Sequence, residues 1–415
     1  MKLVTRFLLG CCFIALLFPN QSVAAEEYVA EANHAIAVEV STGKVLYEKD
    51  ATTTTSIASI TNLLTAYLVY EAMEEGQFIL ETPVEISDYP YNLSLTSPVA
   101  NVTFANRSYT IRQLLQASLI SSASSASIAL AEKVAGSEQK FVDLMRAKLE
   151  SWGISDATIV NASGVNNSYL GDARYPGSSE TDENKLSATA VAIIAYHLLT
   201  DYPQVLEITA MTSYDFSGIT YSNSNLMLKN MTYSRNGVDG LKTGTTDSSG
   251  ASFVATSYEN NMRVITVILN ATDGKENPDN RFVATNNLLN YVYQYFSLEE
   301  LVSEGKSYNK SKVPVFNGKS ATSPAVAAND LYVIRRNKNT EPTLATFTSL
   351  QTNFEAPLKK GSVIGTLQLN DTDLIGQGYI DEQPSIDMLA PKTVTEAHWP
   401  VSWWNHFVRY VNENL

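Results

Sequence analysis

The amino-acid sequence predicts an α+β domain, then a small β-rich domain and a C-terminal amphipathic helix. Strand patterns occur at both ends of roughly the first 300 residues, with helical patterns between them, and this order unites distant strands in one sheet. Beyond that point the chain consists of short β-like segments divided by Gly, Asn and Pro. It ends in a tryptophan-rich pattern of helical period.

Residues 1–25 have the features of an export signal. Lys2 and Arg6 supply positive charge, Phe7 to Phe18 form an apolar run, and Val23-Ala24-Ala25 offers a small-residue cleavage site. The apolar run is too short to span a bilayer. A lipoprotein signal ending at Cys11 is the alternative, but the apolar run continues beyond that residue. We therefore expect an exported mature chain.

The composition of the mature chain excludes several classes of function. Both cysteines, Cys11 and Cys12, lie in the signal, so disulfides and cysteine-bound metals are not expected. Removing Lys2 and Arg6 leaves 27 basic against 43 acidic residues, a net charge of −16. Such an acidic chain disfavours nucleic acid and anionic membranes as partners. Histidines do not cluster with carboxylates at metal-binding spacing, and neither a metal nor a cofactor is expected.

The elements of the first domain follow from the period of its apolar residues. A hairpin is predicted at 34–47, with its turn at 41–44. Helices are predicted at 56–76, at 111–135 with a break in the serine cluster 121–127, at 145–152, at 187–199 and at 286–296. Two central strands are predicted at 252–257 and 263–269.

The last part of the chain combines β patterns with an aromatic helix. Short strands such as 331–334 and 363–367 predict a small β domain over about residues 313–388. Three of the four tryptophans, Trp399, Trp403 and Trp404, share one helical face with Phe407. Such a helix can lie in a membrane interface. The alternative is a helix that closes the β domain by packing.

Three segments carry residues suited to acyl transfer. Ser59 begins a helical pattern, Ser122 lies in the serine cluster, and Lys242 opens a strand pattern with Thr243, Gly244 and Thr245. A serine hydroxyl is a weak nucleophile until a base takes its proton. None of the four histidines is near these segments, which disfavours a Ser-His-Asp triad. A lysine kept neutral by burial is the remaining base.

In this order the segments resemble the motifs Ser-x-x-Lys, Ser-x-Asn and Lys-Thr-Gly of the serine-type D-alanyl-D-alanine carboxypeptidases. These are low-molecular-mass penicillin-binding proteins, and the chain resembles their streptococcal members. The resemblance covers roughly residues 30–415 and includes Asn223-Ser224-Asn225-Leu226. After the signal peptide at 1–25, it implies a transpeptidase domain of the penicillin-binding-protein/β-lactamase type at 26–298, an antiparallel sheet flanked by helices. A C-terminal β domain at 305–390 and a membrane-associating helix at 393–415 follow.

The resemblance also implies a role for each site residue. Ser59 would be the nucleophile, and Ser122 would relay protons to the leaving group. Lys242 and Thr243 would bind the substrate carboxylate, and Gly244 would leave room for the peptide backbone. The N–H groups of Thr245 and Ser59 would form the oxyanion hole.

The chain departs from the family at two motif positions. Asn62 stands where the family has the lysine base, one helical turn after Ser59, and an amide cannot accept and return a proton near neutral pH. Ser124 stands where the family has asparagine, which would loosen the hold on the substrate's peptide carbonyl. A close-packed serine-alanine helix, without a catalytic role, is the alternative reading of this second segment.

Three functions remain as hypotheses. The first is a D,D-carboxypeptidase of peptidoglycan maturation that acts on stem peptides ending in D-Ala-D-Ala, with Lys242 as substitute base and β-lactams as further ligands. The second is a non-catalytic relative that binds wall peptides or a partner protein. The third is a β-lactamase, for whose additional base the sequence offers no candidate. Loss of a general base costs about 10²–10⁴-fold in rate, so we expect impaired turnover. We expect the protein at the outer face of the cell membrane or in the cell wall of a Gram-positive bacterium.

Overall fold

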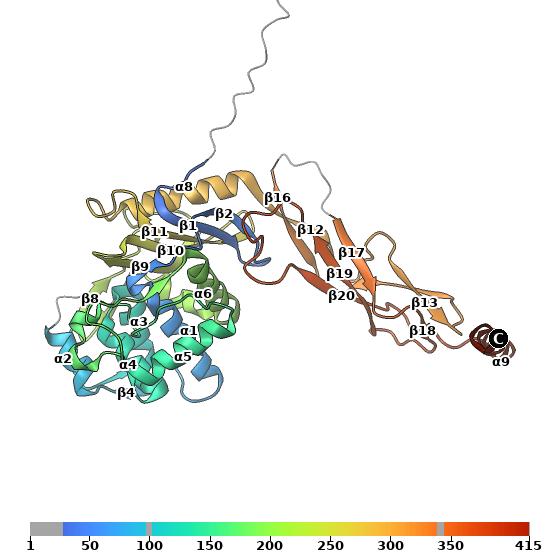
Figure 1. Cartoon of the computed structure of the whole chain (residues 1–415), viewed down its shortest axis with the longest axis horizontal. Helices are drawn as coiled ribbons and strands as arrows, with labels where there is room; N and C mark the ends of the chain where they lie inside the picture. The colour runs from blue at the N-terminus through green and yellow to red at the C-terminus, as the bar shows by residue number, and fades with distance from the viewer. Residues whose placement is uncertain (1–27, 97–101, 338–343, 415) are drawn as a thin grey trace, which may run out of the picture.

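The computed structural model describes residues 28–96, 102–337 and 344–414. The predicted export signal lies outside these residues. The molecule is elongated (Figure 1), with an α+β part at one end, a β-rich part beside it and helix α9 (Trp399–Asn414) at the far end. The predicted order of an α+β part, a β-rich part and a terminal helix is therefore confirmed.

Five antiparallel strands form the sheet of the α+β part, in the order β2-β1-β11-β10-β9. Their bounds are β1 Ala32–Glu39, β2 Val45–Lys49, β9 Val238–Thr246, β10 Gly250–Glu259 and β11 Met262–Ala271. The sheet thus joins the start of this part to its end, as predicted. Strand β9 pairs only with β10 in this sheet, so Lys242 lies on an edge strand.

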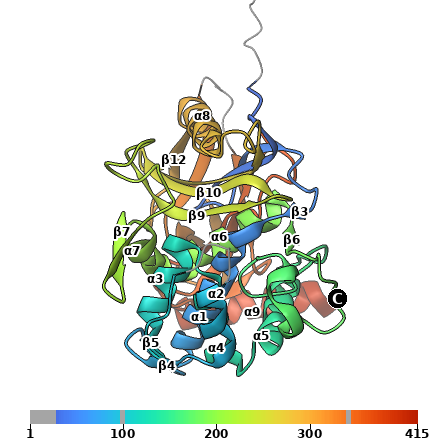
Figure 2. The ribbon, with the colours of Figure 1, turned by 90° about the vertical axis from the view of Figure 1, so that its left-hand side faces the viewer.

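Helices cover both faces of the sheet (Figures 1 and 2). Helix α8 (Asn280–Tyr295) packs on one face, and α6 (Ala188–Asp201) packs on the other with the remaining helices behind it. Side chains of β10 alternate between these layers. Val254 is buried in the core on the α6 side, whereas Phe253 and Ala255 are buried in the core under α8.

The layer on the α6 side positions the serine motifs. Its elements are η1 Ala58–Thr61, α1 Asn62–Glu74, α2 Asp88–Thr96, α3 Ile111–Ser121, α4 Ser124–Ala135, α5 Glu138–Ser151, the short helices η2 Asn167–Tyr169, η3 Gly171–Ala173, η4 Pro203–Val205 and α7 Leu206–Thr209, and the small strands β3 Thr55–Ser56, β4 Pro83–Glu85, β5 Ser108–Thr110, β6 Lys185–Leu186, β7 Ser213–Phe216 and β8 Ile219–Ser222. The helix predicted from residue 56 starts with a 3₁₀ turn.

Other boundaries differ from the prediction for local reasons. The break in the serine cluster is confined to Ser122 and Ala123, because Ser122 takes a left-handed conformation that ends α3. Helix α5 begins earlier than predicted, since the Ser137 hydroxyl accepts from the N–H of Lys140 and caps it.

The β-rich part contains three small sheets, β12-β16, β14-β13-β18 and β15-β20-β19-β17. The strands are β12 Phe296–Val302, β13 Lys312–Phe316, β14 Thr322–Pro324, β15 Val326–Ala327, β16 Leu331–Arg336, β17 Leu344–Ser349, β18 Phe354–Glu355, β19 Val363–Asn370 and β20 Ser385–Leu389. They enclose a separate apolar core.

The two parts are joined at the hairpin turn between β1 and β2. The backbone N–H of Val45 donates to the carbonyl of Gly378 at 2.8 Å, and the N–H of Ile380 donates to the carbonyl of Gly43 at 2.9 Å. Lys44, fully buried, forms an ion pair of 2.5 Å with Asp371. A buried pair of this kind fixes geometry, and removal of one partner leaves an uncompensated charge.

Candidate active site

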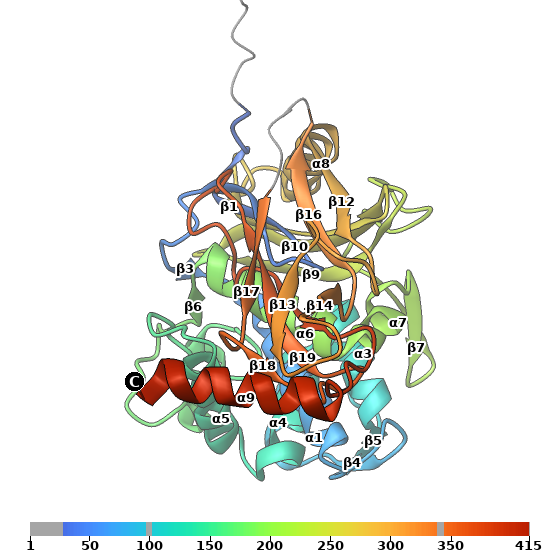
Figure 3. The same ribbon diagram turned by 90° about the vertical axis from the view of Figure 1, so that its right-hand side faces the viewer.

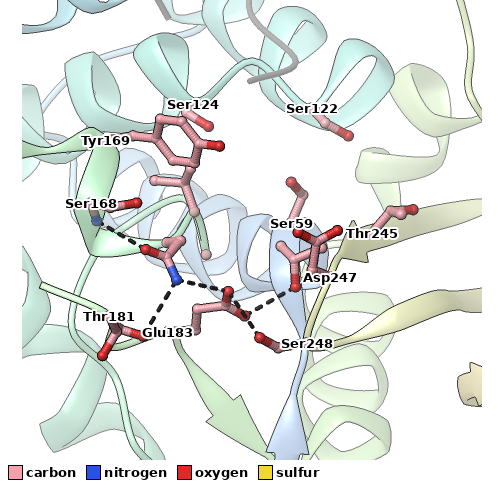
Figure 4. A pocket seen from close by; sticks show the side chains of 14 residues that line it. Ser59, Ser122, Ser124, Ser168, Tyr169, Thr181, Glu183, Thr245, Asp247 and Ser248 are labelled. Atoms are coloured by element: carbon pink, nitrogen blue, oxygen red, sulfur yellow. Dashed lines mark hydrogen bonds between the residues drawn. The ribbon is translucent and has the colours of Figure 1, made fainter. Parts of the chain in front are cut away.

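A cleft of about 620 Å³ opens at the edge of β9 (Figure 4). Ser59 of η1, Ser122 and Ser124 of the α3–α4 junction and Thr245 of β9 all line it. The loop of residues 161–184, which we call the cleft loop, and the turn from β9 to β10 form the other walls. The fold therefore brings together the three segments that the sequence singled out.

Two glycines hold the turn that carries Ser59. A Cβ atom on Gly244 would lie 2.6 Å from the carbonyl oxygen of Ile57, and one on Gly164 would lie 1.9 Å from that of Ala58. Only glycine allows β9 and the cleft loop to approach this turn so closely. Ala58 itself has a φ of +49°, an uncommon conformation for a residue with a side chain. The nucleophile's backbone is thus tightly constrained from two sides.

Lys242 is buried beneath the cleft and contacts Ser122. Its Nζ donates to the Ser122 hydroxyl and, at 2.9 Å, to the carbonyl of Thr243. Burial and, to a smaller extent, the charge of Arg281 together lower the pKa of Lys242 to about 7. A substantial fraction of this amine is therefore neutral at physiological pH. Figure 4 shows Ser122 and Ser59 facing the same space in the cleft.

Arg281 of α8 reaches the same strand from the opposite face of the sheet. Its Nη1 donates to the Thr245 hydroxyl at 2.8 Å and to the carbonyl of Gly244 at 3.2 Å. Burial lowers its pKa. The sequence analysis missed this residue. The sequence does contain a feature that could have revealed it. Arg281 precedes Thr285 by four residues and Leu288 by seven, so this cation falls on the buried face of the helix.

The segment Asn223-Ser224-Asn225 supports the same strand. The hydroxyls of Ser224 and Thr243 lie 2.8 Å apart, and Ser224 also donates to the carbonyl of Ile120 at the end of α3. This segment therefore ties the Lys-Thr-Gly strand to the helix that leads into Ser122.

Asn62 does not line the cleft. It is completely buried, its Nδ2 donates to the carbonyl of Ser118 at 2.9 Å, and its Oδ1 accepts from the Ser127 hydroxyl at 3.2 Å. The hydroxyls of Ser118 and Ser127 are also paired, at 2.8 Å. Asn62 thus belongs to a satisfied, neutral network between α1, α3 and α4, and it offers the site no proton acceptor of lysine type.

Glu183 is a second residue that the sequence analysis missed. Only 4 % exposed, it lines the cleft and accepts hydrogen bonds from Asn166, Thr246 and Ser248. Neither its spacing nor its neighbours in the sequence marks it, because its partners come from two distant segments.

These features define a class of protein. A serine on a constrained helix start, a partly neutral lysine in contact with a second serine, and an open strand edge form a serine-type peptidase site of the penicillin-binding kind. The comparisons with known proteins specify the family.

The D-alanyl-D-alanine carboxypeptidase family model matches residues 20–273, and the model of the penicillin-binding protein 5 C-terminal domain matches residues 296–396. The chain therefore belongs to the D-alanyl-D-alanine carboxypeptidase family, and its role lies in peptidoglycan maturation. Family members of this type are exported to the cell envelope.

Individual relatives agree with this assignment. A solved structure of a peptidoglycan synthesis regulatory factor, PBP3 of Streptococcus pneumoniae, is 53% identical with a TM-score of 0.83 over 88% of this chain and 100% of that one. The D-alanyl-D-alanine carboxypeptidase DacC of Escherichia coli is 28% identical over 91% of this chain and 90% of its own. Cefotaxime-bound penicillin-binding protein D2 of Listeria monocytogenes is 26% identical, with a TM-score of 0.54 over 65% and 100% of the two chains.

Proposed function

We propose that the protein binds stem peptides ending in D-Ala-D-Ala and acylates on Ser59, with Lys242 as the proton acceptor. The observation that carries the proposal is the contact of the buried Lys242 amine with the Ser122 hydroxyl, combined with its pKa of about 7. A general base works best when its pKa is near the working pH.

The geometry assigns a step to each residue. The peptide pairs with the free edge of β9, and its carboxylate is held by the hydroxyls of Thr243 and Thr245, with Arg281 behind them. The Ser59 hydroxyl attacks the penultimate carbonyl while its proton passes by way of Ser122 to Lys242. The same proton then goes to the departing D-alanine amine, and water hydrolyses the ester. The N–H groups of Ser59 and Thr245 stabilise the oxyanion.

We further propose that turnover is slow. Asn62 supplies no base, and the Ser124 hydroxyl offers the peptide carbonyl one donor hydrogen where an asparagine amide would offer two. β-Lactams should enter by the same route, since a relative was solved with cefotaxime bound.

Intact-mass measurement after incubation with benzylpenicillin tests the proposal. We expect a slowly formed adduct that maps to Ser59 and is absent in Ser59→Ala. Ser168→Ala is a matched control, because Ser168 also lines the cleft but belongs to none of the three motifs. Labelling that persists in Ser59→Ala would refute Ser59 as the nucleophile. A complete lack of labelling of the natural chain would refute acylation and favour a protein that binds the peptide without turnover.

We also propose that α9 attaches the protein to the outer face of the cell membrane of a Gram-positive bacterium. None of the helices in the described ranges combines the length and apolar character needed to cross a bilayer. However, α9 lies across the end of the β-rich part (Figure 3) and exposes Trp399, Trp403, Trp404 and Phe407 by 45–82%. Tryptophan favours the headgroup region, and exposed aromatic patches mark interfaces.

Contacts of the opposite helix face support this orientation. Asn317 donates to the Ser402 hydroxyl at 2.9 Å, and the Arg409 guanidinium lies 4.5 Å from the ring centre of Phe316. The polar face is thus engaged by the β-rich part while the aromatic face is open. We propose residues 26–298, 305–390 and 393–415 as the units of the mature chain.

A further inference from the structure

We propose that Glu183 is a positioning residue that fixes the Thr245 end of β9 against the cleft loop. The inference rests on the proposed function, because it concerns the same cleft. It adds a residue to which none of the three motifs assigns a role.

The first observation is that this carboxylate is buried and fully engaged. Its Oε2 accepts from the Thr246 hydroxyl at 3.0 Å, and its Oε1 accepts from Asn166 Nδ2 at 3.0 Å and from the Ser248 hydroxyl at 3.4 Å. A charge removed from water is destabilising unless hydrogen bonds compensate it. All three donors line the cleft. The burial cost is therefore offset only when these walls are in place.

The second observation is the location of Thr246. It directly follows Thr245, whose N–H and hydroxyl face the substrate in the proposed mechanism, and it ends strand β9. The turn to β10 is closed by Thr246 and Ser249, since the N–H of each residue donates to the hydroxyl of the other, at 2.7 and 3.0 Å. Glu183, which belongs to the cleft loop, accepts from the Thr246 and Ser248 hydroxyls of this turn.

The third observation concerns the other side of the connection. Asn166 of the cleft loop also donates to the carbonyl of Thr181, and its own Oδ1 accepts from the N–H of Ser168. Glu183 therefore joins an internally bonded loop to an internally bonded turn. Without it the two walls would be linked less tightly, and the oxyanion donor at Thr245 would lose a fixed position relative to Ser59. Misplacement of a catalytic donor by about 1 Å can cost about 10²-fold in rate.

Two substitutions separate hydrogen bonding from charge. Glu183→Gln keeps the shape, since its oxygen can accept from Asn166 and its amide can donate to the Thr246 hydroxyl oxygen, but it removes the charge. Glu183→Ala removes both. Asp182→Ala is the matched control, because Asp182 is the adjacent residue and its carboxylate accepts from the N–H and the hydroxyl of Ser179 within the same loop.

The experiment has one readout that does not require activity. Amide hydrogen exchange of residues 243–249 should speed up about tenfold or more in Glu183→Ala and remain unchanged in Glu183→Gln and Asp182→Ala. The affinity of a synthetic acylated peptide ending in D-Ala-D-Ala should fall about tenfold in Glu183→Ala alone, without loss of thermal stability beyond that of the control.

Thr246→Val breaks the same connection from the side of the strand, so its exchange of residues 243–249 and its peptide affinity can be measured alone if Glu183→Ala folds poorly. Where both variants fold, they form a double-mutant cycle. The effects of Thr246→Val and Glu183→Ala on peptide affinity should be strongly non-additive, because both break the same connection. The hydrogen bond that Thr246→Val loses within its own turn is lost in both backgrounds and cancels.

Three results would overturn the proposal. They are additive effects in this cycle, an equal response in Asp182→Ala, or a peptide affinity lost in Glu183→Gln with exchange unchanged, which would assign Glu183 a purely electrostatic role. If the natural chain binds no such peptide while the exchange pattern is as expected, the proposed function fails and the positioning role of Glu183 is supported.

Discussion

The pH dependence of Ser59 acylation distinguishes the two roles that Lys242 can have. As a base, its amine must be neutral, whereas as an anchor for the substrate carboxylate it must be charged. With a pKa of about 7, roughly half of the amine is neutral at pH 7, but a lysine with the ordinary pKa of 10.5 would be neutral in about one molecule in 3,000. The lowered pKa thus raises the neutral fraction of the Lys242 amine at pH 7 by on the order of 10³-fold.

The expected profile follows from this titration. If Lys242 is the base, the second-order rate constant for benzylpenicillin should rise about tenfold per pH unit below pH 7 and level off above it. If Lys242 is a cationic anchor, the rate should fall as the pH rises through 7. Intact-mass kinetics between pH 5.5 and 9 provide the assay. Lys242→Arg keeps the charge but cannot deprotonate, and should reduce the rate at least about 100-fold.

A second buried group titrates in the same range and must be separated from Lys242. Glu138 is completely buried, and burial raises its pKa to about 7. It accepts from the N–H of Ala162 in the cleft loop at 3.0 Å and from the Tyr89 hydroxyl at 3.1 Å. Glu138→Gln mimics its protonated form, so the rising profile should persist in this variant. A profile that becomes flat in Glu138→Gln, or one that falls with pH in the natural chain, would refute Lys242 as the base.

Three further predictions follow from the site and the terminal helix. Asn62→Lys with Ser124→Asn should raise D-alanine release from a D-Ala-D-Ala peptide by about 10²–10⁴-fold, with effects that couple rather than add; a folded but inert double variant would show that the defect lies elsewhere. Glu138 has a folded-state pKa raised from 4.5 to about 7, so its contribution to stability is present below about pH 4.5 and is lost as the pH rises to 7. The natural chain should therefore lose on the order of 3 kcal/mol relative to Glu138→Gln between pH 4 and 8, measured by urea unfolding, and parallel curves would contradict the shift. Full-length protein should bind lipid vesicles with little dependence on salt, and removal of residues 399–415 should abolish binding; this cut keeps Val394, which is buried in the β-rich core, and equal partitioning of both forms would make α9 a packing element.

The elements of the fold were predictable where apolar residues recur with a regular period. They were less predictable where a single contact sets the start or the shape of an element. The hairpin, the central strands and α6 follow their apolar patterns closely. The early start of α5 depends on the Ser137 cap, and the 3₁₀ turn at Ser59 depends on glycines more than 100 residues away in the chain, at 164 and 244. The sequence around Ser59 contains no information about contacts with residues so far away in the chain.

The residues of the candidate site also fall into two groups, those that the sequence predicts and those that only the fold reveals. Ser59, Ser122 and Lys242 were found because their spacing follows family motifs. Glu183 and Arg281 act through partners distant in the chain, so only the fold shows that they meet the same strand. Lys44 makes the converse point. Its Ser-x-x-Lys spacing with Ser41 has no catalytic meaning, since its amine is buried against Asp371 at the junction of the two parts.

Because residue 62 is an asparagine, the proposed mechanism leaves the proton transfer to one residue, Lys242. The amide is satisfied by Ser118 and Ser127 and exchanges no proton, so it neither assists Ser59 nor adds positive charge near Lys242. Burial and Arg281 then keep the Lys242 amine partly neutral, and its contact with Ser122 connects it to the cleft. Glu183 lies in the cleft, but its oxygens are occupied by three donors, which stabilise its charged form and make it a poor acceptor. Any acylation of Ser59 by the proposed route must therefore pass its proton to Lys242, and with this one partly neutral amine as base we expect acylation to be slow rather than absent.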